Sequence, residues 1–70
     1  MRTFPIVEKL GGRAAVAKMR GVSVHAIRMW AQRRRIPGDD LAALILAVEK
    51  AGIPFEARDL RVIEIRDAAE

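Results

Sequence analysis

The segment from residue 17 to residue 30 constrains the fold of this 70-residue chain more than any other part of it. The small residue Ala17 stands four positions before Gly21, and Ser23 follows two positions after that glycine. Two short helices that cross steeply can touch only where a side chain is as small as alanine, and a tight turn needs a residue that adopts a positive φ at low cost. The spacing therefore predicts two helices that meet at Ala17 and are joined by a turn at Gly21.

The second of these helices is predicted to begin near Ser23. The Ser23 hydroxyl can accept a hydrogen bond from a backbone N–H of the first turn, and Val22 is expected to pack the turn against the core. Ile27 and Trp30 are three residues apart and share the inward face of an amphipathic helix, so Trp30 is interpreted as a core residue rather than a stacking surface. Together with the preceding helix this is the pattern of a helix-turn-helix, over about residues 13–33.

The opposite face of this helix carries side chains that can reach base edges in the major groove of DNA. Arg28 is the first candidate, because a guanidinium can bond guanine O6 and N7 together, and Gln32 can do the same for adenine. His25 lies near the helix start, close to the groove floor in the expected docking. A solvated helix face is the alternative interpretation of the whole set. The candidate base-contacting residues are Ser23, Val24, His25, Arg28, Met29 and Gln32.

A run of three arginines at residues 33–35 follows this helix. Cations at a helix C-terminus complement the helix dipole by about 0.3 kcal/mol or more each, which gives the run a structural role. Three in a row exceed that need, so at least one is expected to bind a DNA phosphate, as is Arg13 at the start of the preceding helix. The candidate phosphate-contacting residues are Arg13, Lys18, Arg33, Arg34 and Arg35.

Charge is divided unevenly along the chain, whose net charge is +4. Up to Arg35 there are nine Lys and Arg residues against a single acidic residue, Glu8. From Ile36 onward there are four basic residues against eight acidic ones. This division suggests one face for a polyanion such as nucleic acid and another face for a different partner.

Length and composition argue against an enzyme. Seventy residues make one domain, over residues 1–70, whose core is too small to carry a catalytic cleft as well. The chain has no cysteine and one histidine, and we find no nucleophile–base pair and no phosphate-binding loop. We therefore expect no catalysis, no metal and no cofactor. Because the sequence lacks a signal-peptide pattern and an apolar run of about 20 residues, we expect a bacterial-type cytoplasmic location and no membrane partner.

The remaining segments complete the prediction of a mainly α fold with four to five helices. Helices are expected over residues 3–10, 13–20, 23–33 and about 39–51, with a short helical turn through residue 60. The second helix is expected to pack through Val16, Ala17 and Met19. Residues 61–66 are rich in β-branched residues, and Ile63 and Ile65 alternate with charged residues, which favours a strand. A helix that continues to the C-terminus is the alternative. In the fourth helix a buried stripe is expected at Leu41, Leu44, Ile45 and Val48.

From residue 6 to residue 61 the chain resembles the small Cro-like repressors of phages, and especially the YdaS-type regulators, which are Cro-like proteins proposed to be antitoxins. The resemblance rests on Leu10-Gly11-Gly12-Arg13-Ala14-Ala15-Val16-Ala17, Gly21-Val22-Ser23, Ala26-Ile27, Trp30, Arg35-Ile36-Pro37 and Asp59-Leu60-Arg61. It implies a Cro/lambda-repressor-like helix-turn-helix domain whose helix after the Gly-Val-Ser turn enters the major groove. Such proteins usually carry leucine where this chain has Arg20, so the helix before the turn is expected to pack through Met19 or through the aliphatic stem of the arginine.

A strand that follows the helices can pair across a dimer in Cro-like proteins, so a strand here would imply a partner. A monomer of this size reads only a few base pairs. We therefore expect a homodimer on a two-fold symmetric site, with half-sites about 34 Å apart. The candidate dimer-interface residues are Leu46, Val62, Ile63 and Ile65.

The leading functional hypothesis is a sequence-specific regulator that binds double-stranded DNA, most simply a repressor that occupies a promoter. The same scaffold would serve a phage switch, an antitoxin that controls its own operon, or a regulator of mobile-element genes. One alternative is a protein-interaction module whose acidic C-terminal half holds a toxin or a polymerase subunit. The other is a non-specific nucleic-acid binder.

Overall fold

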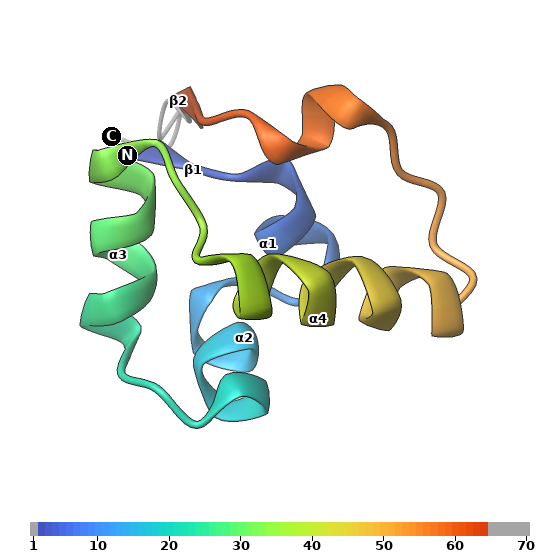
Figure 1. Cartoon of the computed structure of the whole chain (residues 1–70), viewed down its shortest axis with the longest axis horizontal. Coiled ribbons are helices and arrows are strands. Elements are labelled where there is room, and N and C mark those ends of the chain that lie inside the picture. Colours follow the sequence, from blue (N-terminus) through green and yellow to red (C-terminus); the bar gives the residue numbers. More distant parts are fainter. Residues whose placement is uncertain (1, 65–70) are drawn as a thin grey trace, which may run out of the picture.

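The chain folds into four α-helices, one 3-10 helix and a two-stranded sheet within residues 2–64, the part that the computed structural model describes. Figure 1 shows α3 standing beside α2, with the two strands near the C-terminal end of α3. The expectation of a mainly helical fold is thereby confirmed. In chain order the elements are β1 (Arg2–Thr3), α1 (Pro5–Lys9), α2 (Arg13–Arg20), α3 (Val24–Arg33), α4 (Gly38–Lys50), η1 (Ala57–Leu60) and β2 (Ile63–Glu64).

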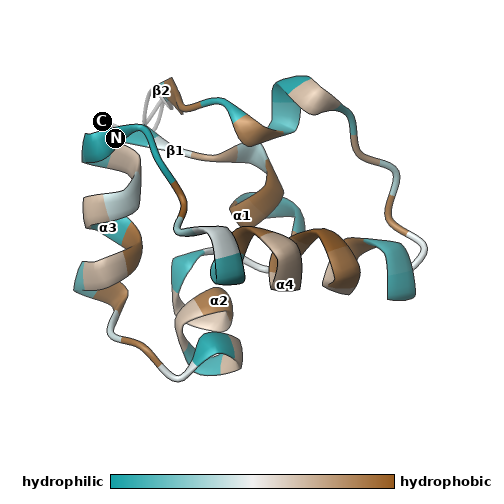
Figure 2. Cartoon of the chain, viewed as in Figure 1, coloured by the Kyte–Doolittle hydropathy of each residue, from teal (hydrophilic) through white to brown (hydrophobic). Residues whose placement is uncertain are grey.

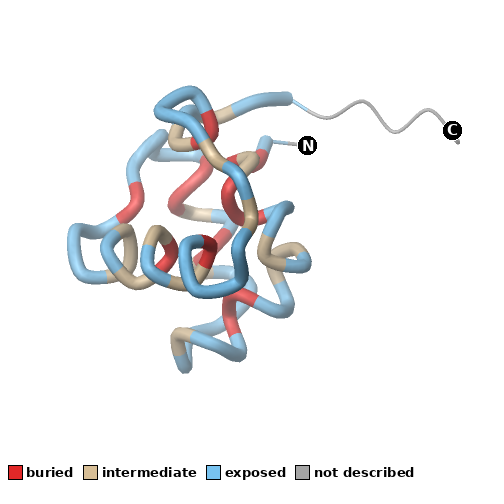
Figure 3. The backbone as a smooth tube through the Cα atoms, turned by 90° about the vertical axis from the view of Figure 1, so that its right-hand side faces the viewer, coloured by how far each residue is buried: buried red, intermediate tan, exposed pale blue. Residues whose placement is uncertain are grey.

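The core lies where the apolar faces of the α-helices meet. Figure 2 shows hydrophobic residues along α1 and α4 and hydrophilic residues at the C-terminal end of α3, and Figure 3 shows buried segments from several elements gathered inside the molecule. Each fully buried aliphatic or aromatic side chain stabilises the fold by about 1.5–3 kcal/mol. The buried apolar residues are Phe4, Ile6, Val7, Val16, Ala17, Ile27, Trp30, Ala31, Ile36, Leu44 and Val48.

The helices α2 and α3 have their predicted bounds to within one residue, and so does the turn between them. Helix α2 ends at Gly21, whose φ of 67° is left-handed and costs a glycine no steric clash. Ser23 caps α3, because the Ala26 N–H donates to Ser23 Oγ at 3.1 Å. Ala17 is buried, as a close approach of α2 and α3 requires, and Trp30 is buried as a core residue. These predictions are confirmed.

Two side chains near this turn were wrongly predicted to pack inward. Met19 is 44% exposed and Val22 is 36% exposed. Residues four apart share a helix face, so Arg20 follows Val16 on the inner stripe of α2 and Met19 falls outside it. The turn itself is closed by the backbone, because the Val22 N–H donates to the Ala17 carbonyl at 3.0 Å, and the valine side chain stays partly exposed.

The first helix was predicted to begin at Thr3 but begins at Pro5. The residue before a proline is pushed out of the helical region, and Phe4 accordingly has an extended backbone (φ −97°, ψ 133°). Arg2 and Thr3 therefore form the strand β1 instead of a helical turn. Phe4 is buried in the core, where no sequence expectation had placed it.

The strand predicted near the C-terminus is present as β2, and it pairs with a strand of the same chain. β2 pairs antiparallel with β1, with Thr3 opposite Ile63 and Arg2 opposite Glu64. The expectation that a strand here implies a second copy of the chain was therefore wrong. The extended residues before Pro5 form β1, and β1 takes the place beside β2 that a second copy of the chain was expected to take.

Two ion pairs join elements that are distant in the sequence. Lys9 Nζ donates to Asp59 Oδ2 at 2.6 Å and to the Pro54 carbonyl at 2.8 Å, which ties α1 to η1. Arg20 Nε donates to Asp40 Oδ1 at 2.7 Å, which ties the end of α2 to the start of α4. Arg20 is half-buried, so this second ion pair is only partly exposed to solvent.

Helix α4 carries the expected apolar stripe, with Leu44 and Val48 fully buried and Leu41 and Ile45 partly buried against the core. Leu46 lies off this stripe and is 51% exposed. Across the described residues, no helix has both the length and the apolar composition that crossing a membrane would require.

Leu44 and Leu46 form a matched pair for testing the core, because they lie on the same helix and only Leu44 is fully buried. Leu44→Ala is expected to lower the free energy of unfolding by about 2–5 kcal/mol, through lost burial and the cavity left behind. Leu46→Ala is expected to change it by less than about 0.5 kcal/mol. Urea denaturation of both variants measures this, and equal losses would contradict the packing described for α4.

The stability of the fold should also decrease at low pH, because the Asp59 carboxylate becomes protonated. The Lys9 hydrogen bond, with help from the Glu56 N–H, holds the pKa of the Asp59 carboxyl below its usual range. A carboxyl with a lowered folded-state pKa stabilises the fold above its unfolded-state pKa of about 3.9, and this contribution is lost as the pH falls through the folded-state pKa. Asp59→Asn should therefore be less stable than the unmodified chain at pH 7, and the gap should close below about pH 4.

Thermal unfolding across this pH range checks the acid dependence. Glu49→Gln is the control, because it removes one carboxylate from an exposed residue that makes no ion pair with another described residue. The role of the Lys9 contact would be contradicted if the difference in thermal stability between Asp59→Asn and the unmodified chain stayed constant from pH 7 to about pH 2, which is below the usual carboxyl range.

Candidate functional site

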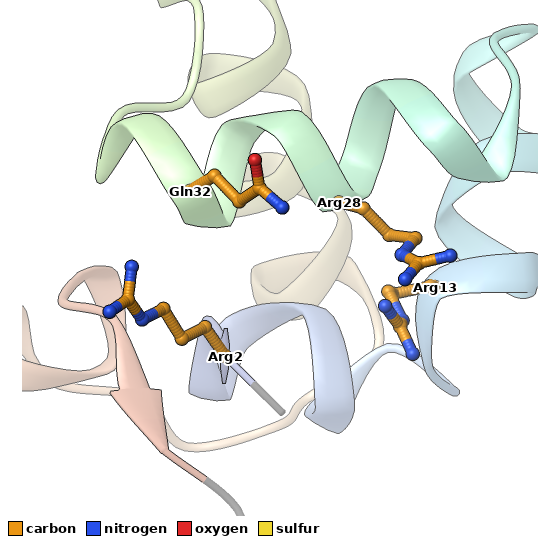
Figure 4. A pocket seen from close by; sticks show the side chains of 4 residues that line it. All are labelled: Arg2, Arg13, Arg28 and Gln32. Carbon is orange, nitrogen blue, oxygen red and sulfur yellow. The ribbon is translucent and has the colours of Figure 1, made fainter.

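A cleft of about 620 Å³ lies along the exposed face of α3. Its lining side chains come from three elements: Arg28 and Gln32 from α3, Arg13 from the start of α2, and Arg2 from β1 (Figure 4). Figure 4 shows Arg28 extending toward Arg13 at one end of the cleft, while Arg2 lies at the other end below Gln32. The cleft therefore brings together side chains that are up to 30 positions apart in the sequence.

The core packing of α3 decides which of its side chains line this cleft. Ile27, Trp30 and Ala31 are buried, and together they fix the rotation of the helix about its axis. Arg28 and Gln32 are four residues apart, so they share one face, and that face is turned to solvent.

Arg13 and Arg2 are placed by the backbone around them. Arg13 is the first residue of α2, and Gly12 before it has a φ of 96° that L-residues rarely adopt, so the chain can turn sharply into the helix. Side chains alternate along a strand, and Thr3 is buried, so Arg2 points to the opposite side of β1 and into the cleft.

The electrostatics of the cleft favour an anion. Three of the four lining side chains are guanidinium groups and none is acidic. Arg2 and Arg28 make no ion pair with any other residue of the described range 2–64. Like charges that converge in one cleft repel one another, and an anion bound between them relieves this repulsion.

The chemistry of the lining groups is that of recognition. A guanidinium offers five N–H donors in a planar fork, and the Gln32 amide offers both a donor and an acceptor. Such forks match the paired oxygens of a phosphate and the paired acceptors of a guanine edge. The planar, cationic fork of each of these three guanidiniums is therefore suited to binding an anion.

The predicted base-contacting residues divide into two groups. Arg28 and Gln32 line the cleft, whereas Val24 and His25 are exposed at the N-terminal end of α3. The hydroxyl of Ser23 is engaged in capping the helix. Met29, which was expected to face outward, is half-buried and offers only part of its side chain to solvent.

The run of arginines is divided by the end of α3. Arg33 is the last helical residue, and Arg34 follows with a left-handed φ of 56°, the one non-glycine residue with a positive φ in the described part of the chain. Arg33 and Arg35 line a second hollow of about 390 Å³ together with the buried Trp30 and the start of α4. Arg34 lines neither hollow, and neither does Lys18 on α2.

Arg2 is the lining residue that sequence reasoning missed. The signal that was present is local: Thr3 is β-branched and Phe4 precedes a proline, and both features favour an extended chain end. What was missing is the pairing of this end with residues 63–64, some 60 positions away, which no local pattern indicates.

The four residues predicted for a dimer interface have different surroundings. Leu46 and Ile63 are exposed, at 51% and 43%, on α4 and β2. Val62 is partly buried against the core of its own chain. Ile65 lies outside the described residues.

Comparisons of the chain with protein-family models, with curated proteins and with solved structures found no significant match. The function is therefore inferred from the residues of this chain and their geometry.

The left-handed Arg34 gives a test of the C-terminal end of α3. A non-glycine residue in this conformation costs about 1–2 kcal/mol, and glycine adopts it freely. Arg34→Gly is therefore expected to raise the free energy of unfolding by about 1 kcal/mol. Arg35→Gly is the control, because it removes one arginine from a position without a positive φ and should bring no such gain. Chemical denaturation measures both, and a loss of stability in Arg34→Gly would contradict the strain.

Proposed function

We propose that this protein is a sequence-specific, double-stranded DNA-binding transcriptional regulator in which α2 and α3 form a helix-turn-helix. The observation that carries the proposal is the cleft on the exposed face of α3, where three guanidiniums and one amide converge without an acidic neighbour among the lining residues. An α-helix fits the major groove of B-DNA, which is about 12 Å wide, and α3 is the helix that presents base-reading side chains beside basic ones.

In this function the side chains of α3 have separate roles. Arg28 bonds the O6 and N7 atoms of a guanine, and Gln32 bonds an adenine. The exposed Val24 and His25 reach base edges from the N-terminal end of the helix, which lies deepest in the groove in the usual docking. Met29 contributes an apolar contact to a thymine methyl group through its exposed part only.

Phosphate contacts surround this helix and fix its register without reading sequence. Arg13 projects beside Arg28, so it meets the DNA backbone where the N-terminal half of α3 enters the groove. Arg33 and Arg35 converge on the second hollow, and Arg34 and Lys18 add to the positive potential from exposed positions. Ser23 contacts a phosphate only in addition to its capping bond.

The regulatory role that we propose is repression by occupying a promoter, in the manner of the Cro-like family that the sequence resembles. Such a protein acts in the bacterial cytoplasm, where the genome lies. A phage switch, an antitoxin operon and a mobile-element promoter are equally compatible targets.

The ion pairs weigh against the alternative of a protein-interaction module with an acidic surface. Asp40 and Asp59 are engaged by Arg20 and Lys9, and Glu56 is engaged by Arg58 at 2.7 Å. Three of the six acidic residues between positions 36 and 64 are therefore paired within the molecule. Arg2 and Arg28 in the cleft make no ion pair with another residue of the range 2–64, so a polyanion is the better match.

We also propose that the protein binds DNA as a homodimer. One recognition helix contacts only a few base pairs, and two helices on a two-fold axis read half-sites about 34 Å apart. Leu46 and Ile63 are the exposed apolar residues available for this interface, since Val62 contributes to the core of its own chain.

Arg28→Ala tests the base readout. Selection from a random duplex library at about 0.15 M salt, where distant charges are screened, should enrich a palindrome with the unmodified protein. Arg28→Ala should lose discrimination at one base pair of each half-site, worth about 1–3 kcal/mol. Arg58→Ala is the matched control, because it removes the same charge from an exposed residue of η1 that lies outside the cleft, and it should select the same sequence.

Three other outcomes would contradict parts of the proposal. Enrichment of a single half-site would contradict the dimer. Enrichment of no sequence, with an affinity that falls steeply with salt, would identify a non-specific binder. An unchanged selection by Arg28→Ala would remove Arg28 from base readout and count against this docking of α3.

A further inference from the structure

We propose that Arg2 contacts a DNA phosphate, and that the C-terminal strand β2 controls this contact because it holds β1 beside α3. This inference rests on the proposed function and assigns a role to a residue outside the helix-turn-helix. Arg2 lines the same cleft as Arg28 and Gln32. The long sequence separation between Arg2 and β2 makes the contact a property of the tertiary fold.

Three interactions anchor β1 in this position. Phe4 is buried in the core immediately after the strand. The buried Thr3 donates its hydroxyl to Glu8 Oε2 at 3.0 Å, which ties the strand to α1. β2 then pairs with β1, with Ile63 opposite Thr3 and Glu64 opposite Arg2.

The direction of the Arg2 side chain follows from this anchoring. With Thr3 turned inward, the alternation along the strand turns Arg2 outward, and Figure 4 shows it extending into the cleft beside α3. Glu64 lies directly across the sheet, yet the two side chains form no ion pair. The guanidinium is therefore available for an external anion.

The position of Arg2 favours a phosphate over a base edge. The side chain comes from β1, at the flank of the helix that fills the groove, and the flanks of a major groove are its phosphate backbones. A phosphate contact contributes affinity and salt dependence but carries no sequence information. Removing Arg2 should therefore change the salt dependence of DNA binding, whereas removing Arg28 should change the sequence preference.

The test compares Arg2→Ala with Arg61→Ala, which removes the same charge from an exposed residue that lines neither hollow. Binding to a mixed-sequence duplex of about two helical turns is measured against salt concentration. Arg2→Ala should reduce the steepness of the log–log salt dependence by about 0.9, the value for one phosphate contact. Arg61→Ala should leave it unchanged, and Arg2→Lys should restore the salt dependence because it keeps the charge.

The control by β2 is tested with Glu64→Pro, because Glu64 lies opposite Arg2 and a proline removes the strand N–H at that position. Its matched control is Glu64→Gln, which removes the same charge and keeps the backbone N–H. Relative to Glu64→Gln, the affinity of Glu64→Pro should fall with the same change in salt dependence as in Arg2→Ala, and the double variant should lose no more than Glu64→Pro alone. Where Glu64→Pro does not fold, as judged by its thermal transition, Glu64→Gly weakens the strand and takes its place. Additive losses in the double variant would overturn the link between β2 and Arg2.

The outcomes separate this inference from the proposed function. Equal salt dependences for Arg2→Ala and Arg61→Ala, with selectivity still lost in Arg28→Ala, would overturn the role of Arg2 and leave the regulator standing. A reduced salt dependence in Arg2→Ala, with unchanged selectivity in Arg28→Ala, would support the Arg2 contact and count against the proposed base readout.

Discussion

The packing of α3 through Ile27, Trp30 and Ala31 is the constraint on which the rest of the structure depends. All three side chains are buried, and burying the apolar surface of each larger one contributes about 1.5–3 kcal/mol. A rotation of α3 about its axis would expose them, so the core holds the helix in one orientation. The same orientation turns Arg28 and Gln32 to solvent. The surface that we propose to read DNA is therefore selected by the interior of the protein.

Two ion pairs connect the basic first half of the chain with its acidic second half. Lys9 and Arg20 belong to the basic first half, yet both are neutralised by acidic residues of the second half. Arg2 and Arg28, which make no ion pair with another residue of the range 2–64, line the cleft beside α3, and Arg33 and Arg35 line the hollow at its C-terminal end. Lys9 and Arg20 therefore stabilise the fold through ion pairs and contribute less positive charge to the surface than the sequence alone suggests.

Sequence reasoning succeeded where the determining contacts are local. The bounds of α2 and α3, the Ser23 cap and the left-handed Gly21 each follow from residues within a turn or two of one another. It was wrong for Met19, which falls outside the helix face shared by Val16 and Arg20, and for Val22, because an apolar residue in a turn does not reveal which way the backbone directs its side chain. It also began the first helix too early, although Pro5 carried the signal that Phe4 would be extended.

The sequence by itself determined the bounds of α2 and α3 and the inward stripe of α3, and it made Arg13, Arg28 and Gln32 candidates for DNA contact, because helical periodicity and capping act over a few residues. Only the tertiary structure decided that β2 pairs with the N-terminal end of the same chain and that Arg2 joins the cleft. Strand pairing is a contact between distant segments, and two short β-prone stretches leave the choice of partner open. The anchoring of the N-terminus by Phe4 and Thr3 places the edge of β1 within reach of β2, and so makes the pairing intramolecular.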